Sequence, residues 1–386
     1  MSNSSLANIC NFMNGGTPSK KRPEYFQGDI PWISSADIVD GEVTEPRNRI
    51  TKAAIAESAT NLVPKGTVLL VTRTGVGKVT VAPFDLCFSQ DITAIIPKQK
   101  DKFLPEYLAY FLQSCEASLK AQQRGATIQG ITREALKSLN VPVKSLEIQK
   151  RIVDRLTLAK SLRTKRQKTI VELDSYFRSL FIEMFGDPVT NPKGWEVLKL
   201  SEFVEFLTSG SRGWAEYYAD SGAIFIRIQN VKDTRLVLDD VAFVNAPDNA
   251  EAKRTKVRPG DLLISITADL GRTCVIPTDV GDAYINQHLA LIRLKNINPL
   301  YIANFIESAA GMAQLLKLNR AAVKAGLNFN DIRSLEIPIP PLELQNKFEA
   351  KWLQHQQLRR QLLTSQNDIQ NLFASLLSES FSGGAT

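Results

Sequence analysis

The sequence predicts an α+β fold in which two similar globular domains are separated by two long antiparallel helices that form a coiled coil with pseudo-twofold symmetry. Three observations predict it. A chain of 386 residues is too long for one ordinary hydrophobic core. Blocks of sequence recur in the same order at a nearly constant separation. Each repeat also ends in a stretch of about 40 residues whose apolar side chains keep helical spacing.

The internal repeat is clearest where LNVPVKSLEIQKRI, from Leu139, aligns without a gap with LEIPIPPLELQNKF, from Leu335, at a separation of 196 residues (335 − 139 = 196). Other blocks follow in the same order. GTVLLVTRTGVGK from Gly66 aligns with GDLLISITADLGR from Gly260, SQDITAIIPK from Ser89 with NQHLALIRLK from Asn286, and LPEYLAYFLQS from Leu104 with NPLYIANFIES from Asn298. WISSADI from Trp32 and FIRIQNV from Phe225 align less closely, as do the segments at Gly15 and Ser209. We infer an internal duplication.

The globular part of each repeat spans residues 1–143 and 187–340. Residues 67–72, 79–83 and 92–96 are rich in β-branched side chains and are bounded by Gly, Asp or Pro, which predicts strands. Residues 105–122 begin with Pro and carry apolar side chains at helical spacing, so they predict one helix.

The second part of each repeat, residues 144–186 and 341–382, predicts a single long helix. Glu147 and Glu343 lie in the first turns, where the helix dipole favours a carboxylate, and Gly186 and Pro188 end the first helix. About 40 residues make a rod on the order of 60 Å long. Such a rod cannot bury its apolar stripe within one small domain, so we expect the two helices to pack against each other, antiparallel.

The composition is that of a folded soluble protein, with 44% hydrophobic and 23% charged residues, and the net charge of +7 favours an anionic partner. The four cysteines form no CxxC pair, which argues against a zinc site or a disulfide framework. No apolar run approaches the ~18 residues of a membrane span. We therefore expect a cytoplasmic protein with no membrane contact.

Taken together, these motifs resemble the specificity subunit of a Type I restriction-modification system over essentially the full chain. The blocks that carry the resemblance are GTVLLVTRTGVGK, the helix entries SLEIQKRI and PLELQNKF, and FGDPVTNPKGWEVLKLSE from Phe185. The resemblance implies that residues 1–143 and 187–340 are target recognition domains that each read half of a bipartite, asymmetric double-stranded DNA sequence. It also implies that helices 144–186 and 341–382 set the gap and dock methyltransferase subunits. This chain departs from the family pattern by beginning almost at once with its first recognition domain.

The sequence offers little for catalysis. There are only two histidines, and we expect one of them, His355, to lie in the polar part of a long helix. TGVGK at Thr74 is no phosphate loop, because Thr72 and Val79 stand where that motif needs Gly and Ser or Thr, so a turn between strands is favoured. The tetrapeptide that amino-methyltransferases place over a flipped base is also missing. We therefore expect a non-catalytic subunit without a cofactor, with S-adenosylmethionine on the partner. Two methyltransferase subunits and a motor-nuclease subunit are the implied partners.

Several groups of polar side chains are candidates for DNA contact, because Lys and Arg bind phosphates while Arg, Asn, Gln and Ser read base edges. The candidates are a basic loop (Lys20, Lys21, Arg22), the repeated turn (Arg73, Lys78, Arg272), a shared strand end (Ser34, Ser35, Arg227, Gln229, Asn230), two turn glutamines (Gln90, Gln287), Arg212, and the loops before the last strands (Arg124, Gln129, Arg320, Lys324, Asn328). For each group a structural alternative stays open: basic surface loops, satisfied strand-edge hydrogen bonds, or ordinary turns.

Two other functions also remain open from the sequence. The chain could be a coiled-coil adaptor whose globular domains bind proteins, or the specificity subunit of a related system that combines methyltransferase and nuclease. Affinity for random duplex DNA that falls as salt rises distinguishes DNA reading from an adaptor.

Overall fold

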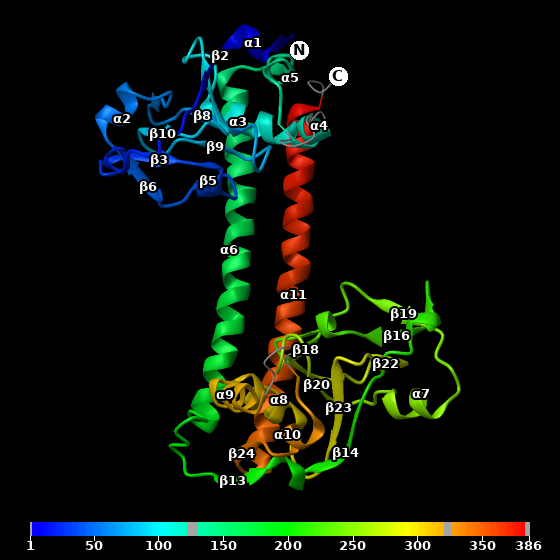
Figure 1. Cartoon of the computed structure of the whole chain (residues 1–386). Helices are drawn as coiled ribbons and strands as arrows, with labels where there is room; N and C mark the ends of the chain where they lie inside the picture. The colour runs from blue at the N-terminus through cyan, green and yellow to red at the C-terminus, as the bar shows by residue number, and fades with distance from the viewer. Residues whose placement is uncertain (1, 122–129, 320–325, 383–386) are drawn as a thin grey trace. The chain divides into compact units, whose positions relative to one another are not determined.

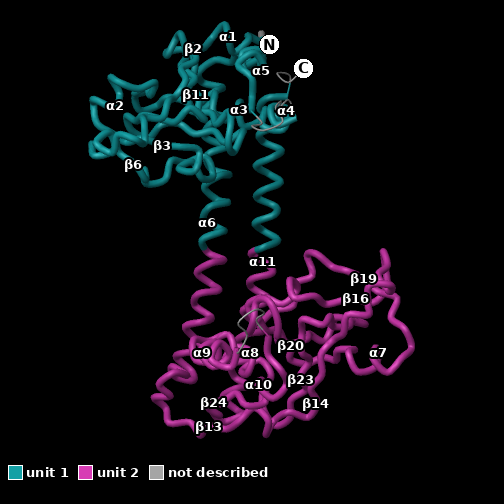
Figure 2. The backbone as a smooth tube through the Cα atoms, in the orientation of Figure 1, with its two compact units in different colours: residues 1–168, 363–386 teal, residues 169–362 magenta. Residues whose placement is uncertain are grey.

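The computed structural model describes residues 2–121, 130–319 and 326–382. The chain divides into two compact units, residues 1–168 with 363–386 (unit 1) and residues 169–362 (unit 2; Figure 2). Both units combine sheets with helices, as Figure 1 shows, so the α+β prediction is confirmed. The two long helices, α6 (Leu146–Phe185) and α11 (Leu342–Phe381), have 40 residues each, and each contributes a segment to both units.

Unit 1 contains two four-stranded sheets. The first is antiparallel, in the order β2 (Cys10–Asn14), β11 (Ile92–Pro97), β8 (Val68–Val71), β9 (Val79–Val81). The second has the order β6 (Asn48–Ile50), β3 (Ile30–Ile33), β10 (Leu86–Phe88), β7 (Leu62–Val63), with β3 and β10 parallel. Two pairs complete the strands: β4 (Ile38–Val39) with β5 (Glu42–Val43), and β1 (Ser2–Ser5) with β12 (Asn140–Val143). The short helices are α1 (Leu6–Ile9), η1 (Pro23–Phe26), η2 (Ser35–Asp37), α2 (Lys52–Ala56), α3 (Pro105–Ser114), α4 (Glu116–Ala121) and α5 (Arg133–Lys137).

Unit 2 repeats this topology except at the edges of the second sheet, where the fourth strand of unit 1 (β7) pairs with β10 but that of unit 2 (β15, Tyr218–Ala219) pairs with β19 (Ala242–Val244). Its antiparallel sheet has the order β14 (Val204–Ser209), β23 (Leu289–Leu294), β20 (Leu262–Ser265), β21 (Thr273–Val275). Its second sheet has the order β15 (Tyr218–Ala219), β19 (Ala242–Val244), β16 (Ala223–Ile226), β22 (Ala283–Ile285), again with one parallel pair. The pairs β17 (Val231–Lys232) with β18 (Arg235–Leu236), and β13 (Glu196–Lys199) with β24 (Glu336–Ile339), match those of unit 1. The short helices are η3 (Leu200–Glu202), η4 (Ala215–Tyr217), η5 (Ile228–Asn230), α7 (Ala250–Thr255), α8 (Pro299–Glu307), α9 (Ala309–Leu318) and α10 (Phe329–Arg333). The predicted duplication is therefore confirmed.

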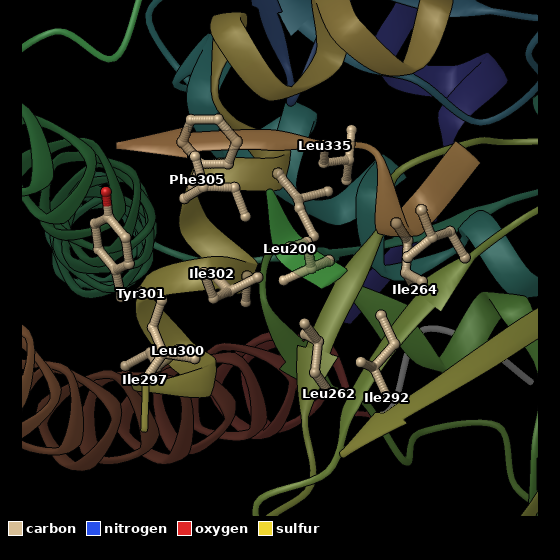
Figure 3. Close-up of a cluster of buried hydrophobic side chains, with 14 of the residues drawn as sticks. Leu200, Leu262, Ile264, Ile292, Ile297, Leu300, Tyr301, Ile302, Phe305 and Leu335 are labelled. Carbon is tan, nitrogen blue, oxygen red and sulfur yellow. The ribbon is translucent and has the colours of Figure 1, made fainter. Parts of the chain in front are cut away.

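The antiparallel sheet of each unit is buried on both faces. In β8, Leu70 belongs to the core shared with α3 and α6, whereas Leu69 belongs to the core shared with the second sheet. In unit 2, Figure 3 shows Leu262 and Ile292 of the sheet gathered with apolar side chains of α8 such as Phe305. Alternate residues of one strand thus fill two cores, and burying each such side chain contributes about 1.5–3 kcal/mol.

Within each unit the two long helices pack antiparallel. In unit 2, Phe177 of α6 contacts Trp352 of α11, with ring centroids 4.8 Å apart, and Phe185 contacts Phe348 at 5.3 Å. In unit 1, the Arg163 guanidinium lies 5.5 Å from the ring centroid of Phe373. The end of α6 is also as predicted, because Gly186 follows with φ of +82°, a left-handed conformation that suits glycine after a helix.

The repeated motif at the helix entry has a structural reason. Gln149 in SLEIQ is buried; its Oε1 accepts a bond from the Leu104 N–H at 2.9 Å, and its Nε2 donates to backbone carbonyls. In PLELQ, Gln345 does the same, accepting from Asn298 N at 2.9 Å and donating to Pro340 O at 2.7 Å. Each glutamine therefore joins the start of a long helix to the loop before α3 or α8.

Two expectations about helices are corrected. Residues 105–122 do not form one helix, because α3 ends at Ser114 and α4 begins at Glu116; within the described residues, Cys115 separates them. His355 does not lie in a polar part of α11: it is buried, and its ring stacks on Trp352 with centroids 5.5 Å apart. Among the helices that the structure describes, none is long and apolar enough for a membrane span.

Candidate nucleic-acid interface

The turn between β8 and β9 has the strand–turn–strand form that the sequence predicts. Gly75 and Gly77 have positive φ values of +87° and +93°, which favour glycine. Lys78 is anchored, since its ammonium donates to the carbonyls of Ser35 at 3.1 Å and Ile38 at 2.9 Å. Arg73, at the start of the turn, is exposed, and no carboxylate among the described residues pairs with it. The turn thus presents one available cation, Arg73, and uses the other to hold the loops together.

The equivalent turn of unit 2 is electrostatically different. The Arg272 Nε donates to the carboxylate of Asp269 at 2.6 Å, and Asp269 lies in the same turn. Ala268 and Gly271 take positive φ values of +62° and +80°, which fold the turn over itself. Arg272 is therefore neutralised within the turn, although its position matches the sequence prediction.

The basic loop of unit 1 also divides into free and engaged cations. Lys20 and Lys21 are exposed and form no ion pair in the described part of the chain. Arg22 instead pairs with Glu24 at 2.8 Å and Glu57 at 2.6 Å. Its guanidinium lies 4.2 Å from the ring centroid of Tyr25, and the hydrogen bonds to the two carboxylates raise the pKa of Arg22 above its ordinary value. Arg22 thus fastens the loop, and the two lysines project from it.

The shared strand ends form matching caps. In unit 1, Asp37 Oδ2 accepts from both the backbone and the hydroxyl of Ser34 at 2.8 Å, and the Ser35 carbonyl accepts from Lys78. In unit 2, Asn230 is buried; its Oδ1 accepts from Arg227 N at 2.9 Å, and its Nδ2 donates to two carbonyls.

Two side chains near the unit 2 cap share one acid. Arg227 and Gln229 both bind Asp240, at 3.1 Å and 3.2 Å, and hydrogen bonds from Gln229 and then Arg227 lower the pKa of that carboxyl. Asn230 is fully used inside the protein, whereas Gln229 is exposed. Of the cap residues, Gln229 is therefore the side chain that solvent reaches most freely.

The remaining candidates are two glutamines in turns, a helix cap and several basic or amide side chains in loops. Gln90 is exposed and its amide oxygen accepts from the Thr17 hydroxyl, while the Gln287 amide lies 3.0 Å from His288 Nε2. Asn328 caps α10 by accepting from Asn330 N at 2.8 Å. Arg212 is exposed and has no carboxylate partner among the described residues. The candidates that lie outside the described residues are Arg124, Gln129, Arg320 and Lys324.

Two arginines at the glycine turns were missed from the sequence. Arg133 donates to the Asn14 side chain at 2.7 Å, just before Gly15, although 119 residues separate the two. In unit 2, Arg254 donates to Thr208 Oγ1 at 2.6 Å and also to the Ser209 carbonyl, just before Gly210. Both arginines are exposed. No local motif signals either contact, because each depends on a loop returning to the turn.

The described residues contain no group of three or more His, Cys, Asp or Glu side chains that is arranged to hold a metal ion. The candidate residues are mainly surface cations and amides carried on turns at strand ends. Such groups suit phosphate and base contacts.

Comparison with known families places the chain among characterised proteins. The family described as the Type I restriction modification DNA specificity domain matches residues 1–172 and 192–360, which cover most of both units.

The chain belongs to the Type I DNA specificity family. A relative from Methanocaldococcus jannaschii, the Type I restriction enzyme MjaIX specificity subunit, is 26% identical over 370 residues, covering 89% of this chain and 84% of that protein. The crystal structure of a Type I S subunit from M. genitalium is 14% identical with a TM-score of 0.58, and covers 98% of this chain and 96% of its own. A chain from a structural study of type I complex assembly and conformational transition is 19% identical with a TM-score of 0.61, covering 99% and 98%. The two structures share the fold of this family member.

Proposed function

We propose that this protein is the DNA-recognition subunit of a Type I restriction-modification complex and that it reads a bipartite, asymmetric target. The observation that carries the proposal is the duplicated fold with different polar side chains at equivalent turns. Arg73 has no carboxylate partner among the described residues, whereas Arg272 is neutralised. At the strand ends, Asp37 accepts from Ser34 in unit 1, and Asn230 accepts from Arg227 N in unit 2. Two domains of similar fold that carry different polar side chains suit two half-sites of different sequence. The family match over both repeats supports the same reading.

The proposed division of labour follows the repeat. Residues 1–143 and 187–340 are the two target recognition domains, and residues 144–186 and 341–382 are spacer helices that set the gap between half-sites. Because half-site spacing follows protein geometry, a stiff spacer makes the gap length selective. The spacer also docks the methyltransferase subunits, two in the proposed assembly, and a motor-nuclease subunit completes the complex.

The chemistry of the complex is assigned to the partners. This subunit supplies DNA binding and no catalytic group of its own, and S-adenosylmethionine binds the methyltransferase subunit. The proposed site of action is the cytoplasm, where the complex meets DNA.

The proposed DNA contacts fall into two sets. Lys20, Lys21, Arg73 and Arg212 are exposed cations without ion pairs within the described residues, and they contact phosphates. Gln90, Gln229 and Gln287 present amides that can pair with base edges, and Arg133 and Arg254 lie beside the glycine turns. Arg22, Lys78, Arg272 and Asn230 hold the loops in place, because their polar groups are already bonded inside the protein.

Fluorescence polarisation with duplex DNA across a salt series tests this proposal, using the subunit in complex with its methyltransferase. Arg73→Ala should weaken binding to every sequence and reduce the slope of log K against log salt by about 1, the contribution of one phosphate contact. The matched control is Lys100→Ala, which removes an exposed cation from a different loop of the same unit; Lys100 forms no ion pair with any residue that the structure describes. Affinity that is independent of salt in the wild-type complex contradicts DNA reading. Equal slopes for Arg73→Ala and wild type contradict only the role of Arg73.

A further inference from the structure

Unit 1 contains a cleft of about 900 Å³ that the proposed DNA-binding function does not use. Its walls come from the β4–β5 hairpin, the turn before β9, helix α3, and the segments of α6 and α11 that belong to unit 1. Phe373, Tyr110, Val79 and Val81 supply apolar surface. A volume of this size is in the range of sites that bury several side chains or a small ligand.

The duplication provides an internal comparison for this cleft. Helix residues correspond at a separation of 196, so Arg163 and Gln370 in unit 1 match Arg359 and Asp174 in unit 2 (359 − 163 = 196; 370 − 174 = 196). The α3 residue Gln113 matches Glu307 of α8 at a separation of 194. Two carboxylates of unit 2 are thus replaced by neutral amides in unit 1.

In unit 2 these carboxylates tie the hairpin to the helices. Asp174 accepts from Arg235 of the β17–β18 hairpin at 3.3 Å and from Arg359 of α11 at 3.0 Å. Glu307 Oε1 accepts from the backbone N–H groups of Thr234 at 3.1 Å and Thr273 at 2.8 Å. The hairpin is therefore bonded to α6 on one side and to α8 on the other.

In unit 1 the matching positions leave these bonds unmade. Neither Gln113 nor Gln370 forms a hydrogen bond to the hairpin within the described residues. The hairpin instead contacts α6 through Glu42, which pairs with Lys160 at 3.1 Å. Arg163 lines the cleft, half-buried beside Phe373, and no carboxylate in the described part of the chain pairs with it. A half-buried guanidinium next to an aromatic ring favours an added carboxylate, because such a charge-assisted pair is shielded from solvent.

We propose that this cleft binds an amphipathic segment of a partner protein, with a carboxylate of that segment placed on Arg163. The carboxylate pairs with Arg163 as Asp174 pairs with Arg359 in unit 2, and the apolar side chains of the segment cover Phe373 and Tyr110.

The cleft suits a protein better than DNA. Four acids (Asp40, Glu42, Glu106, Glu116) and four bases (Lys78, Lys160, Arg163, Lys165) line it. A polyanion gains no net attraction from such a lining, whereas a peptide with charges of both signs can match it.

The test uses the full chain and a short, end-blocked helical peptide of Leu and Glu, labelled for fluorescence anisotropy. The same peptide with Gln at each Glu position is the ligand control. Binding of the Glu peptide should be at least about tenfold tighter than that of the Gln peptide, the usual effect of one charge-assisted hydrogen bond. Arg163→Ala should remove this difference, and Arg163→Lys should keep part of it.

Gln370→Asp supplies the missing carboxylate within the chain and should weaken binding of the Glu peptide by a similar factor, while Gln370→Asn should leave it unchanged. Hydrogen exchange of the hairpin 38–43 checks that the variants are folded. It should stay as in wild type for Gln370→Asp, because Glu42 stands where the β17–β18 hairpin carries Arg235 and gives the new carboxylate no hairpin partner. The proposal is overturned if neither peptide binds, if both bind equally, or if Gln370→Asp and Gln370→Asn behave alike. Displacement of the Glu peptide by random duplex DNA also overturns it, because the cleft would then be a nucleic-acid site.

Discussion

Replacement of Asp174 should lower the stability of unit 2 with little change in shape. The Asp174 carboxylate lies 3.0 Å from Arg359 Nε, 3.3 Å from Arg235 Nη1 and 3.3 Å from His355 Nε2. These groups come from α6, α11 and the β17–β18 hairpin, so one carboxylate joins three elements. Asp174→Asn keeps the size of the side chain and removes its charge.

The expected loss follows from burial. Asp174 is 20% exposed, Arg235 13% and Arg359 23%. Removing one partner of a fully buried pair costs about 3–5 kcal/mol, whereas an exposed pair contributes about 0–1 kcal/mol. For a cluster about one fifth exposed, we expect Asp174→Asn to lower the free energy of unfolding by about 2–3 kcal/mol. The cost arises because two half-buried guanidinium groups lose their shared carboxylate.

Urea unfolding followed by tryptophan fluorescence reports mainly on unit 2, because Trp195, Trp214 and Trp352 lie in that unit and Trp32 lies in unit 1. The matched control is Asp154→Asn on the same helix, where the carboxylate is exposed and has no ion pair among the described residues. We expect that change to stay within about 0.5 kcal/mol of wild type.

The effect of Asp174→Asn should also depend on pH. Burial raises the pKa of Asp174, but the close contact with the His355 ring, the hydrogen bond from Arg359 and the charges of Arg235 and Arg359 outweigh it and hold the pKa well below its usual range. A carboxyl with a depressed folded-state pKa stabilises the protein above its unfolded pKa of about 4 and loses that contribution as the pH falls further. The difference between wild type and Asp174→Asn should therefore be constant near neutrality and shrink below about pH 4. A loss of under 0.5 kcal/mol at pH 7, or one that grows in acid, refutes the reasoning.

Three further predictions concern the helix entry, the glycine turns and the spacer. Gln345→Ala should destabilise unit 2 by about 2–4 kcal/mol, because it leaves two buried backbone groups without their hydrogen bonds. The control Gln357→Ala, on the exposed face of α11, should have little effect, and urea unfolding measures both variants. Gly66→Ala should lower the free energy of unfolding by about 1–2 kcal/mol, because Gly66 has φ of +85° although no atom lies within 4 Å of an added Cβ. Gly15→Ala should lower it further, because its Cβ would overlap the carbonyl oxygens of Phe88 and Ser89; thermal unfolding measures both variants. Deleting seven residues from both α6 and α11 removes about 10 Å of helix and should shorten the preferred DNA gap by about 3 base pairs without changing the half-sites; an unchanged gap in binding assays contradicts the spacer role.

Much of the fold could be predicted from sequence because its signals are local. The strands at 67–72, 79–83 and 92–96 correspond to β8, β9 and β11, and both long helices were placed within a few residues of their ends. The single helix predicted for 105–122 was wrong, since apolar periodicity continues past Cys115 while the helix does not. Apolar periodicity indicates which side chains share a face, and it does not reveal a one-residue break between two helices.

The candidate interface was less accessible to the same reasoning. Residue type and turn position select Arg73 and Arg272 equally, yet Asp269 neutralises only the second. Lys78 and Arg22 were selected as loop cations. In the structure, the Lys78 ammonium donates to the Ser35 carbonyl, and the Arg22 guanidinium pairs with the Glu57 carboxylate. Their contact with DNA stays a prediction. Because they are already bonded within the protein, they are weaker candidates than Lys20, Lys21 and Arg73.

By itself the sequence determined that the protein is a duplication and where each repeat passes into its long helix, because these depend on spacing along the chain. Only the tertiary structure decided which charges are free. Asp174 and Arg359 are 185 residues apart in the chain and 3.0 Å apart in space. Whether a cation is available to a partner depends on the electrostatic neighbours that folding brings to it, and chain order carries no record of that distance.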